Sequence, residues 1–216
     1  MGWTAGRECR RASRSRQAGR PVDGSGGPEK ATGKAPSDEG VPLRSLSDLF
    51  RNFLQIGYVT DDLDTAAAYL EEKLGTVEVV KHYRSNMGGG KPPWEGGAPG
   101  ESFVVVDGTT ADDWTIDVLL VNAGATNIEI MKPVSGAVDH YRGLLRPDVP
   151  ATVHHLGFTV DDFDEASKVV EAAGRQWAQF GATGDIRFGY LDLTAELGPN
   201  SAANFARLEA ASNVDR

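Results

Sequence analysis

The segment QIGYVTDDLD at residues 55–64 returns one hundred residues later as HLGFTVDDFD at residues 155–164. A generic strand and helix would share only an apolar pattern, whereas here individual side chains recur at one constant offset. We therefore infer an internal duplication of the chain. The identical pairs are Gly57/Gly157, Asp61/Asp161, Asp62/Asp162, Asp64/Asp164, Ala66/Ala166 and Glu71/Glu171.

Each copy begins with a short β-prone run and continues into a helix. In the first copy, apolar residues recur at helical spacing from Leu63 to Leu74, and Gly75 is a typical helix end. The pattern predicts helices over 65–75 and 165–174. The aspartates before each helix are expected to cap its free N–H groups and to favour its dipole.

Several strand candidates follow each helix. A strand, a helix and then more strands, twice over, predict an α+β fold with antiparallel pairing, built from two tandem βαβββ modules. The further strands are expected at 76–83, 102–107, 115–120 and 127–131 in the first copy, and at 176–180, 188–193 and 203–210 in the second.

The chain divides into a tail over 1–48 and a folded domain over 49–216, with one module at about 50–133 and the other at about 150–211. Residues 1–44 hold nine basic and five acidic residues and few apolar ones, so we expect this segment to be disordered. Residues 85–100, SNMGGGKPPWEGGAPG, are too rich in Gly and Pro for a regular element. This loop is expected to be either a functional lid or a mobile connection.

Charge and cysteine content exclude several classes of function. The formal net charge of the 216 residues is -9, which argues against nucleic acid and an anionic membrane as the main partner. Cys9 is the single cysteine, so any metal must be held by histidine and by oxygen ligands. No apolar run approaches the ~18 residues of a membrane span. We expect a cytoplasmic protein.

The repeated motif resembles the entry strand and helix of the vicinal oxygen chelate superfamily, which includes glyoxalase I, methylmalonyl-CoA epimerase, extradiol dioxygenases and antibiotic-resistance proteins. The resemblance runs from Phe53 to the C-terminus. It implies a glyoxalase-like fold, in which two modules form curved facing sheets around one divalent metal. It also implies metal ligands on the first and last strands of each module.

Four residues match those ligand positions: Gln55, Glu129, His155 and Glu209. This set resembles the ligands of the eukaryote-type glyoxalase I and would suit Zn²⁺, Ni²⁺, Co²⁺, Mn²⁺ or Fe²⁺. The metal would stabilise an enediolate, and a carboxylate that leaves the metal could shuttle the proton. By resemblance, Glu129 and Glu209 are the catalytic candidates.

Each of these residues also has a structural explanation. Gln55 could hydrogen-bond a strand edge, and Glu129 could point to solvent from a strand whose isoleucines face a core. His154 and His155 point to opposite faces of a strand, so only His155 shares the face of Gly157. Glu209 shares a face with Arg207, which could neutralise it in place of a metal.

The substrate is expected to be a small oxygen-rich molecule, and glutathione is disfavoured. The resemblance predicts polar glutathione-binding side chains at positions that hold Val59, Pro133 and Ala151 here, and these cannot replace an arginine clamp. Aromatic and apolar candidates suggest a partly aromatic ligand, although they could equally be core. The substrate-binding candidates are Tyr58, Arg84, Trp94, Met131, Phe158 and Tyr190.

The leading hypothesis is a metal-dependent isomerase, epimerase or lyase that works by proton transfer. The alternatives are a metal-free protein that binds a drug-like molecule and, less favoured, an iron-dependent dioxygenase. A dioxygenase needs two histidines and one carboxylate on one face, and only His155 stands at a ligand position. One chain carries both modules and could close its own site, although a homodimer is possible.

Overall fold

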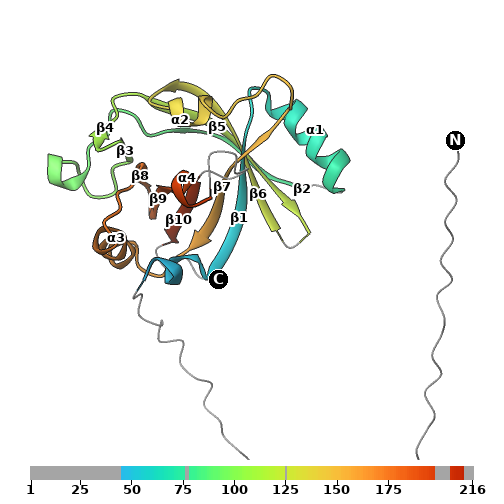
Figure 1. The fold of residues 1–216 in the computed structure, drawn as a ribbon. Coiled ribbons are helices and arrows are strands. Elements are labelled where there is room, and N and C mark those ends of the chain that lie inside the picture. Colours follow the sequence, from blue (N-terminus) through green and yellow to red (C-terminus); the bar gives the residue numbers. More distant parts are fainter. Residues whose placement is uncertain (1–44, 76–77, 125, 198–204, 212–216) are drawn as a thin grey trace, which may run out of the picture. The chain divides into compact units, whose positions relative to one another are not determined.

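The computed structural model describes residues 45–75, 78–124, 126–197 and 205–211, all of which belong to one compact unit. The strands described there form a single mixed sheet in the order β2-β5-β6-β1-β7-β10-β9-β8-β3-β4. The first four strands come from the first copy of the repeat, and the next four from the second. The sheet curls into a half-barrel, with α1 and α3 on opposite sides of the view in Figure 1.

The first module contains β1 (Asn52–Val59), α1 (Leu63–Leu74), β2 (Glu78–Asn86), β5 (Trp114–Ala123) and β6 (Thr126–Gly136). The second contains β7 (Thr152–Thr159), α3 (Phe163–Ala172), β8 (Gln179–Thr183), β9 (Ile186–Asp192) and β10 (Phe205–Ala211). Within each module the last strand runs parallel to the first, and β1 pairs with β7 antiparallel. The predicted α+β class and the two βαβββ modules are thus confirmed.

Short elements precede, interrupt or connect these modules: η1 (Leu46–Phe50), η2 (Pro93–Glu95), β4 (Thr109–Thr110), α2 (Asp139–Arg142) and α4 (Thr194–Leu197). The boundary predicted at residue 48 falls inside η1, where Leu49 is fully buried against α3 and its sheet. Apolar Leu46, Leu49 and Phe50 anchor this turn in the same cluster.

Aspartates cap both long helices as expected. The carboxylate of Asp62 accepts a hydrogen bond from the N–H of Thr65, and that of Asp162 accepts from Asp164 and Glu165. These bonds satisfy N–H groups that have no partner within the helix. The helices therefore begin at Leu63 and Phe163, two residues before the predicted starts, because each cap immediately precedes the first apolar residue.

The expected strand at 102–107 exists, but it does not pair within the first module. As β3 (Phe103–Val106), it crosses to the far end of the sheet and pairs antiparallel with β8 of the second module. The Gly- and Pro-rich loop that precedes it is therefore a connection between the two ends of the sheet. Trp94 in η2 packs against Phe103 and Phe180 and holds this connection in place.

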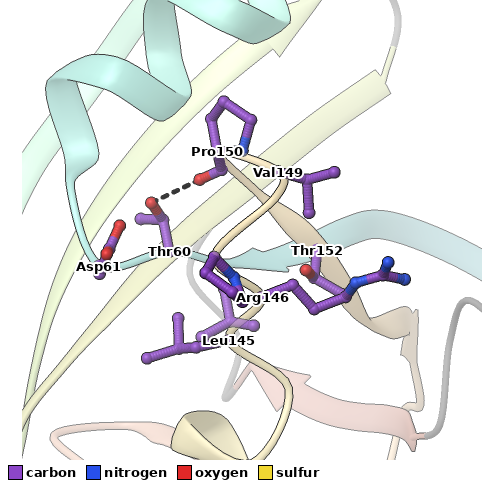
Figure 2. A pocket seen from close by; sticks show the side chains of 9 residues that line it. Thr60, Asp61, Leu145, Arg146, Val149, Pro150 and Thr152 are labelled. Atoms are coloured by element: carbon purple, nitrogen blue, oxygen red, sulfur yellow. Dashed lines mark hydrogen bonds between the residues drawn. The ribbon is translucent and has the colours of Figure 1, made fainter.

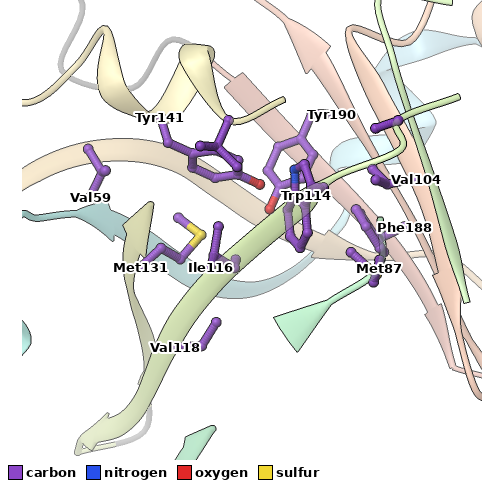
Figure 3. Packing of buried hydrophobic residues seen from close by; sticks show 12 residues of the cluster. Val59, Met87, Val104, Trp114, Ile116, Val118, Met131, Tyr141, Phe188 and Tyr190 are labelled. Carbon is purple, nitrogen blue, oxygen red and sulfur yellow. The ribbon is translucent and has the colours of Figure 1, made fainter. Parts of the chain in front are cut away.

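Buried residues lie in one cluster on the inner face of the curved sheet and in two clusters on its outer face. The inner cluster includes Trp114, Met131, Tyr141, Phe188 and Tyr190 (Figure 3). On the outer face, α1 packs against β5 and β6, and α3 packs against β9 and β10. The inner face is thus the surface toward which both modules present side chains. No helix among the described residues is long and apolar enough to cross a membrane.

Candidate functional site

The two repeated glycines make room for side chains from the opposite module. In the antiparallel pairing of β1 and β7, Gly57 lies opposite His155 and Gly157 lies opposite Gln55. A Cβ on Gly57 would lie 2.0 Å from Cε1 of His155, and one on Gly157 would lie 2.6 Å from Cγ of Gln55. Each glycine therefore lets a polar side chain lie flat across the neighbouring strand.

Three of the predicted site residues meet at this crossing. Gln55 Nε2 lies 3.1 Å from Glu129 Oε2 and 3.4 Å from His155 Nε2, and the latter two atoms are 3.5 Å apart. All three side chains are buried. The amide nitrogen donates to the carboxylate, which fixes one carboxylate oxygen at the centre of the group.

The fourth ligand position holds Arg207. Glu129 on β6 pairs with Gly57 of β1, and the equivalent partner of Gly157 on β10 is Arg207. Glu209, the residue that the resemblance assigns to this position, pairs with Thr159 instead. The strand register decides this, since residues two apart share a face.

Arg207 joins the two carboxylates. Its Nη1 lies 2.8 Å from Glu129 Oε2, and its Nη2 lies 2.8 Å from Glu209 Oε2. The guanidinium also lies over the rings of Phe188 and Tyr190, at 5.4 and 6.0 Å from their centres. The predicted pairing of Arg207 with Glu209 is present, and Glu129 completes a carboxylate–guanidinium–carboxylate chain.

Burial and mutual charge shape the ionisation of this group. Burial raises the pKa of Glu129, and Arg207 offsets part of that increase. Burial lowers the pKa of Arg207, but Glu129, Tyr190 and Glu209 raise it by more, so the guanidinium remains a cation. The site therefore combines a permanent positive charge with a carboxylate that takes up a proton more readily than an exposed glutamate.

Tyr83 of β2 also faces this group. Burial raises its pKa to about 12, and the negative charge of Glu129 adds to the effect. Its neighbour Arg84, which was expected to bind substrate, points the other way: its side chain is 62% exposed and pairs with Asp117 at 2.7 Å. Strand alternation separates the two residues, so Tyr83 is the member of the pair that belongs to the site.

His154 lies beside the site in a buried aromatic stack and not on the opposite face of β7, as strand alternation predicted. The register of β7 against β1 shifts at this point and leaves His154 as an extra residue between Val153 and His155. Its ring stacks on Tyr141 and Phe205, with ring centres 4.6 and 4.9 Å away, and its Nδ1 lies 3.1 Å from Nδ1 of His155. Burial lowers the pKa of both histidines well below the usual value, so both are neutral at pH 7. His154 is therefore a packing residue that orients the ring of His155.

A family model of the Glyoxalase/Bleomycin resistance protein/Dioxygenase superfamily matches residues 54–190. The chain belongs to this superfamily. The match spans β1 to β9 and so includes the duplicated segment, Glu129 and His155. A search of curated proteins found no match.

Several solved structures resemble this chain at low sequence identity. Methylmalonyl-CoA epimerase from Mycobacterium tuberculosis is 15% identical, with a TM-score of 0.44 over 75% of this chain and 89% of that one. A Streptomyces coelicolor methylmalonyl-CoA epimerase variant in complex with 2-nitronate-propionyl-CoA is 16% identical, with a TM-score of 0.46 over 76% and 97%. A hypothetical protein from Bacillus halodurans is 13% identical, with a TM-score of 0.44 over 76% and 97%.

The four superfamily positions do not fit a divalent metal in this chain. Gln55, Glu129 and His155 converge, but the fourth position presents a guanidinium to the same carboxylate oxygen that would bind the ion. Within the part of the chain that the structure describes, no three His, Cys, Asp or Glu side chains are grouped to hold a metal. The expected ligand set is thus incomplete, because Glu209 stands one alternation step away.

The substrate-binding candidates separate into those near the site and those remote from it. Tyr190 lies 5.2 Å from the His155 ring, and Met131 belongs to the same inner cluster. Tyr58 packs in the α1 cluster and Phe158 in the α3 cluster, both on the outer face. Each of these two residues immediately follows a glycine that faces inward, so its side chain points away from the buried group around Glu129. Trp94 is 62% exposed on η2 and contacts Phe180 at the edge of the sheet.

A separate surface cavity of about 220 Å³ opens where β1 ends and β7 begins. Figure 2 shows Thr60 beside Pro150, whose carbonyl accepts a 2.7 Å hydrogen bond from the threonine hydroxyl. Arg146 on its rim is paired with Asp148. None of the predicted metal or catalytic residues lines this cavity, so the buried group around Glu129 remains the candidate site.

Proposed function

We propose that this protein is an enzyme that moves a proton on a carbon atom next to a carbonyl or carboxylate group of a small oxygen-rich molecule. Isomerisation, epimerisation and elimination by a lyase all begin with this step. The observation that carries the proposal is a buried carboxylate, Glu129, held between an amide donor and a permanent cation.

Glu129 is the proposed base. A general base works best when its pKa approaches the working pH, and burial moves the pKa of Glu129 in that direction. The hydrogen bond from Gln55 fixes the direction in which one carboxylate oxygen points. The other oxygen would then accept the substrate proton and return it.

Arg207 is the proposed oxyanion-stabilising group. When a proton leaves the carbon, negative charge develops on the adjacent substrate oxygen. A cation that is already in place stabilises this charge without having to reorganise, and a water-poor surrounding strengthens the effect. Tyr83 and Tyr190 lie near the same guanidinium and would supply further hydroxyl donors.

The metal-dependent form of this reaction, expected from the superfamily ligand pattern, requires a fourth ligand. The close approach of Gln55, Glu129 and His155 favours that form, whereas Arg207 at the fourth position opposes it. We therefore propose a reaction in which the guanidinium provides the positive charge. Zinc, nickel, cobalt, manganese and iron are then not required as cofactors.

Glutathione is not the proposed substrate. Val59, which stands where the resemblance predicts an anchoring arginine, is buried in the apolar inner cluster. Aromatic rings of Phe188 and Tyr190 border the guanidinium instead. A small acid or carbonyl compound with an apolar or aromatic substituent matches this lining. Gln55 and Glu129 come from one module and His155 and Arg207 from the other, so one chain supplies the complete site.

Deuterium exchange tests the reaction directly, because it reports proton removal whatever the product is. The protein is incubated in D₂O with a panel of 2-oxo acids, 2-hydroxy acids and aryl ketones, and loss of the α-proton signal is followed by proton NMR. We expect exchange with at least one compound class, and exchange slower by about a hundredfold or more with the Glu129→Gln variant. Exchange that is not slowed by this substitution would contradict the assignment of the base.

A small-molecule binding protein is the second candidate. The feature that favours it is the packing of aromatic rings around His154 and Tyr190. Such rings would bind an aromatic ligand whether or not the protein converts it. In that case a compound would raise the melting temperature of the protein while its α-proton stayed unexchanged. An iron-dependent dioxygenase is disfavoured, because it needs two histidine ligands and only His155 lies beside Glu129. The His154 ring stacks on Tyr141 and Phe205 instead.

A further inference from the structure

Two strand pairings identify Arg207 as the counterpart of Glu129. The repeat relates Gly57 to Gly157, and the parallel neighbour of each glycine on the closing strand is Glu129 in one module and Arg207 in the other. The duplication has thus placed opposite charges at equivalent points. Their side chains meet, with 2.8 Å between Nη1 and Oε2.

A metal ion and this guanidinium would compete for the same atom. An ion bound to Glu129 would lie about 2.0–2.2 Å from its carboxylate oxygen. Arg207 already donates to that oxygen, and two positive charges so close together repel strongly in a buried setting. Gln55, moreover, presents its amide nitrogen to Glu129, as a hydrogen-bond donor does.

One donor of the guanidinium, Nε, is left for a ligand. Among the described residues, Nε of Arg207 is buried and has no hydrogen-bond partner. The adjacent Nη2 is bound to Glu209, whose side chain is 18% exposed. A buried donor without a partner is costly, so a group that supplies an acceptor there is favoured.

We infer that Arg207 takes the place of the superfamily metal ion and that its Nε–Nη2 edge binds a carboxylate of the ligand. A planar carboxylate accepts two parallel hydrogen bonds from such an edge. Glu209 would release Nη2 and turn toward solvent, while Glu129 would remain on Nη1. The inference deepens the proposed function by naming the ligand class, and its metal-related part does not depend on any catalytic activity.

A cobalt titration tests the replacement of the metal. Wild-type protein, purified and then treated with a chelator, is titrated with Co²⁺ and followed by visible absorption and calorimetry. We expect no site-specific binding to the wild type. Arg207→Glu restores the carboxylate at the fourth position, so this variant should bind about one ion per chain, at least tenfold more tightly than the wild type.

The controls locate any bound cobalt. Adding Glu129→Gln to the Arg207→Glu variant should abolish the binding, whereas adding Glu209→Gln should leave it. Wild-type binding of one ion that Glu129→Gln abolishes would overturn the inference. So would a folded Arg207→Glu variant that binds no better than the wild type. The wild-type titration decides the matter by itself if that variant does not fold.

A matched ligand series tests the carboxylate edge. Phenylpyruvate, mandelate and malonate are compared with their methyl esters by thermal shift and calorimetry, with wild type and Arg207→Met. We expect at least one free acid to bind the wild type tenfold more tightly than its ester, and the preference to vanish in Arg207→Met. Equal binding of acids and esters would overturn the carboxylate assignment, and so would an acid preference that survives Arg207→Met. This comparison measures ligand binding, whether or not the protein catalyses deuterium exchange. A failure of the carboxylate assignment can therefore be distinguished from a failure of the proposed reaction.

Discussion

The imidazole of His155 lies directly over the α-carbon of Gly57, so that an added Cβ would be 2.0 Å from Cε1 of the ring. The glycine that marks the repeat is thus part of the site's geometry. It has no side chain because the neighbouring module needs the space. The same holds for Gly157, beneath the side chain of Gln55.

Substituting Gly57 therefore tests this packing. Gly57→Ala should destabilise the protein by about 1–3 kcal/mol, because the buried ring must move from its position. Chemical denaturation measures the change. In a His155→Ala background the added methyl group should cost much less, and an equal cost in both backgrounds would contradict the packing explanation.

Glu129 is expected to carry the proton. Glu129→Gln keeps the size of the side chain but removes the base, so the deuterium exchange rate should fall about a hundredfold or more. NMR of the α-proton measures this rate. Glu209→Gln is the matched control, and an equal loss in both variants would show that the carboxylates act together.

The pKa of Glu129 should depend on Arg207. Burial raises this pKa and the guanidinium lowers it, so Arg207→Met should raise it further. Exchange activity requires the ionised carboxylate and should therefore rise with pH through a higher pKa in the variant than in the wild type. Carboxyl ¹³C chemical shifts measured across a pH titration give the same information without a substrate. A shift toward lower pKa in Arg207→Met would contradict the ion pair.

Acid should destabilise the fold through its buried histidines. Burial lowers the pKa of His140 to about 4, compared with the ordinary histidine value of 6.5. The unfolded chain therefore binds this proton first, and stability is lost as the pH falls from about 6.5 towards 4, at no more than about 1.4 kcal/mol per pH unit.

His140→Phe keeps the ring but removes the proton, so the melting temperature should depend less on pH in this variant. The exposed His82 supplies a matched control, since His82→Phe introduces the same side chain at the surface. Unchanged acid sensitivity in His140→Phe would assign the loss of stability to other groups.

Arg84 should contribute little to function. Its ion pair with Asp117 lies at the surface, where such pairs contribute less than about 1 kcal/mol. Arg84→Gln is therefore expected to keep ligand binding and exchange activity. Tyr83→Phe, on the inner face, should reduce exchange. The same deuterium exchange assay measures both variants. A larger loss of exchange activity in Arg84→Gln than in Tyr83→Phe would show that Arg84, and not Tyr83, belongs to the site.

Local patterns in the sequence predicted the fold well. The repeat, the helices and most strands depend on residue alternation, helical spacing and capping aspartates, which are properties of short segments. The partner of β3 could not be predicted in this way, because its pairing with β8 joins segments far apart in the chain. Composition identified the loop before it as irregular without revealing that it spans the sheet.

The site was predicted in part for a related reason. Alternation placed Arg207 and Glu209 on one face of their strand, but it could not say which of them stands beside Gly157. That choice depends on the register between β10 and β7. The chain before β10 is longer than the resemblance predicts, so the sequence does not fix this register. Tyr58 could have been excluded from the site by alternation alone, since Gly57 and Tyr58 must face opposite sides.

The crossing of β3 to the second module makes the two halves of the duplication inseparable. A half-chain that ends before β7 would leave β3 without its partner strand, and a half-chain that begins at β7 would leave the edge of β8 uncovered. Unpaired edges of this kind promote aggregation. The two copies must therefore be synthesised in one chain, and they fold and are degraded as one molecule.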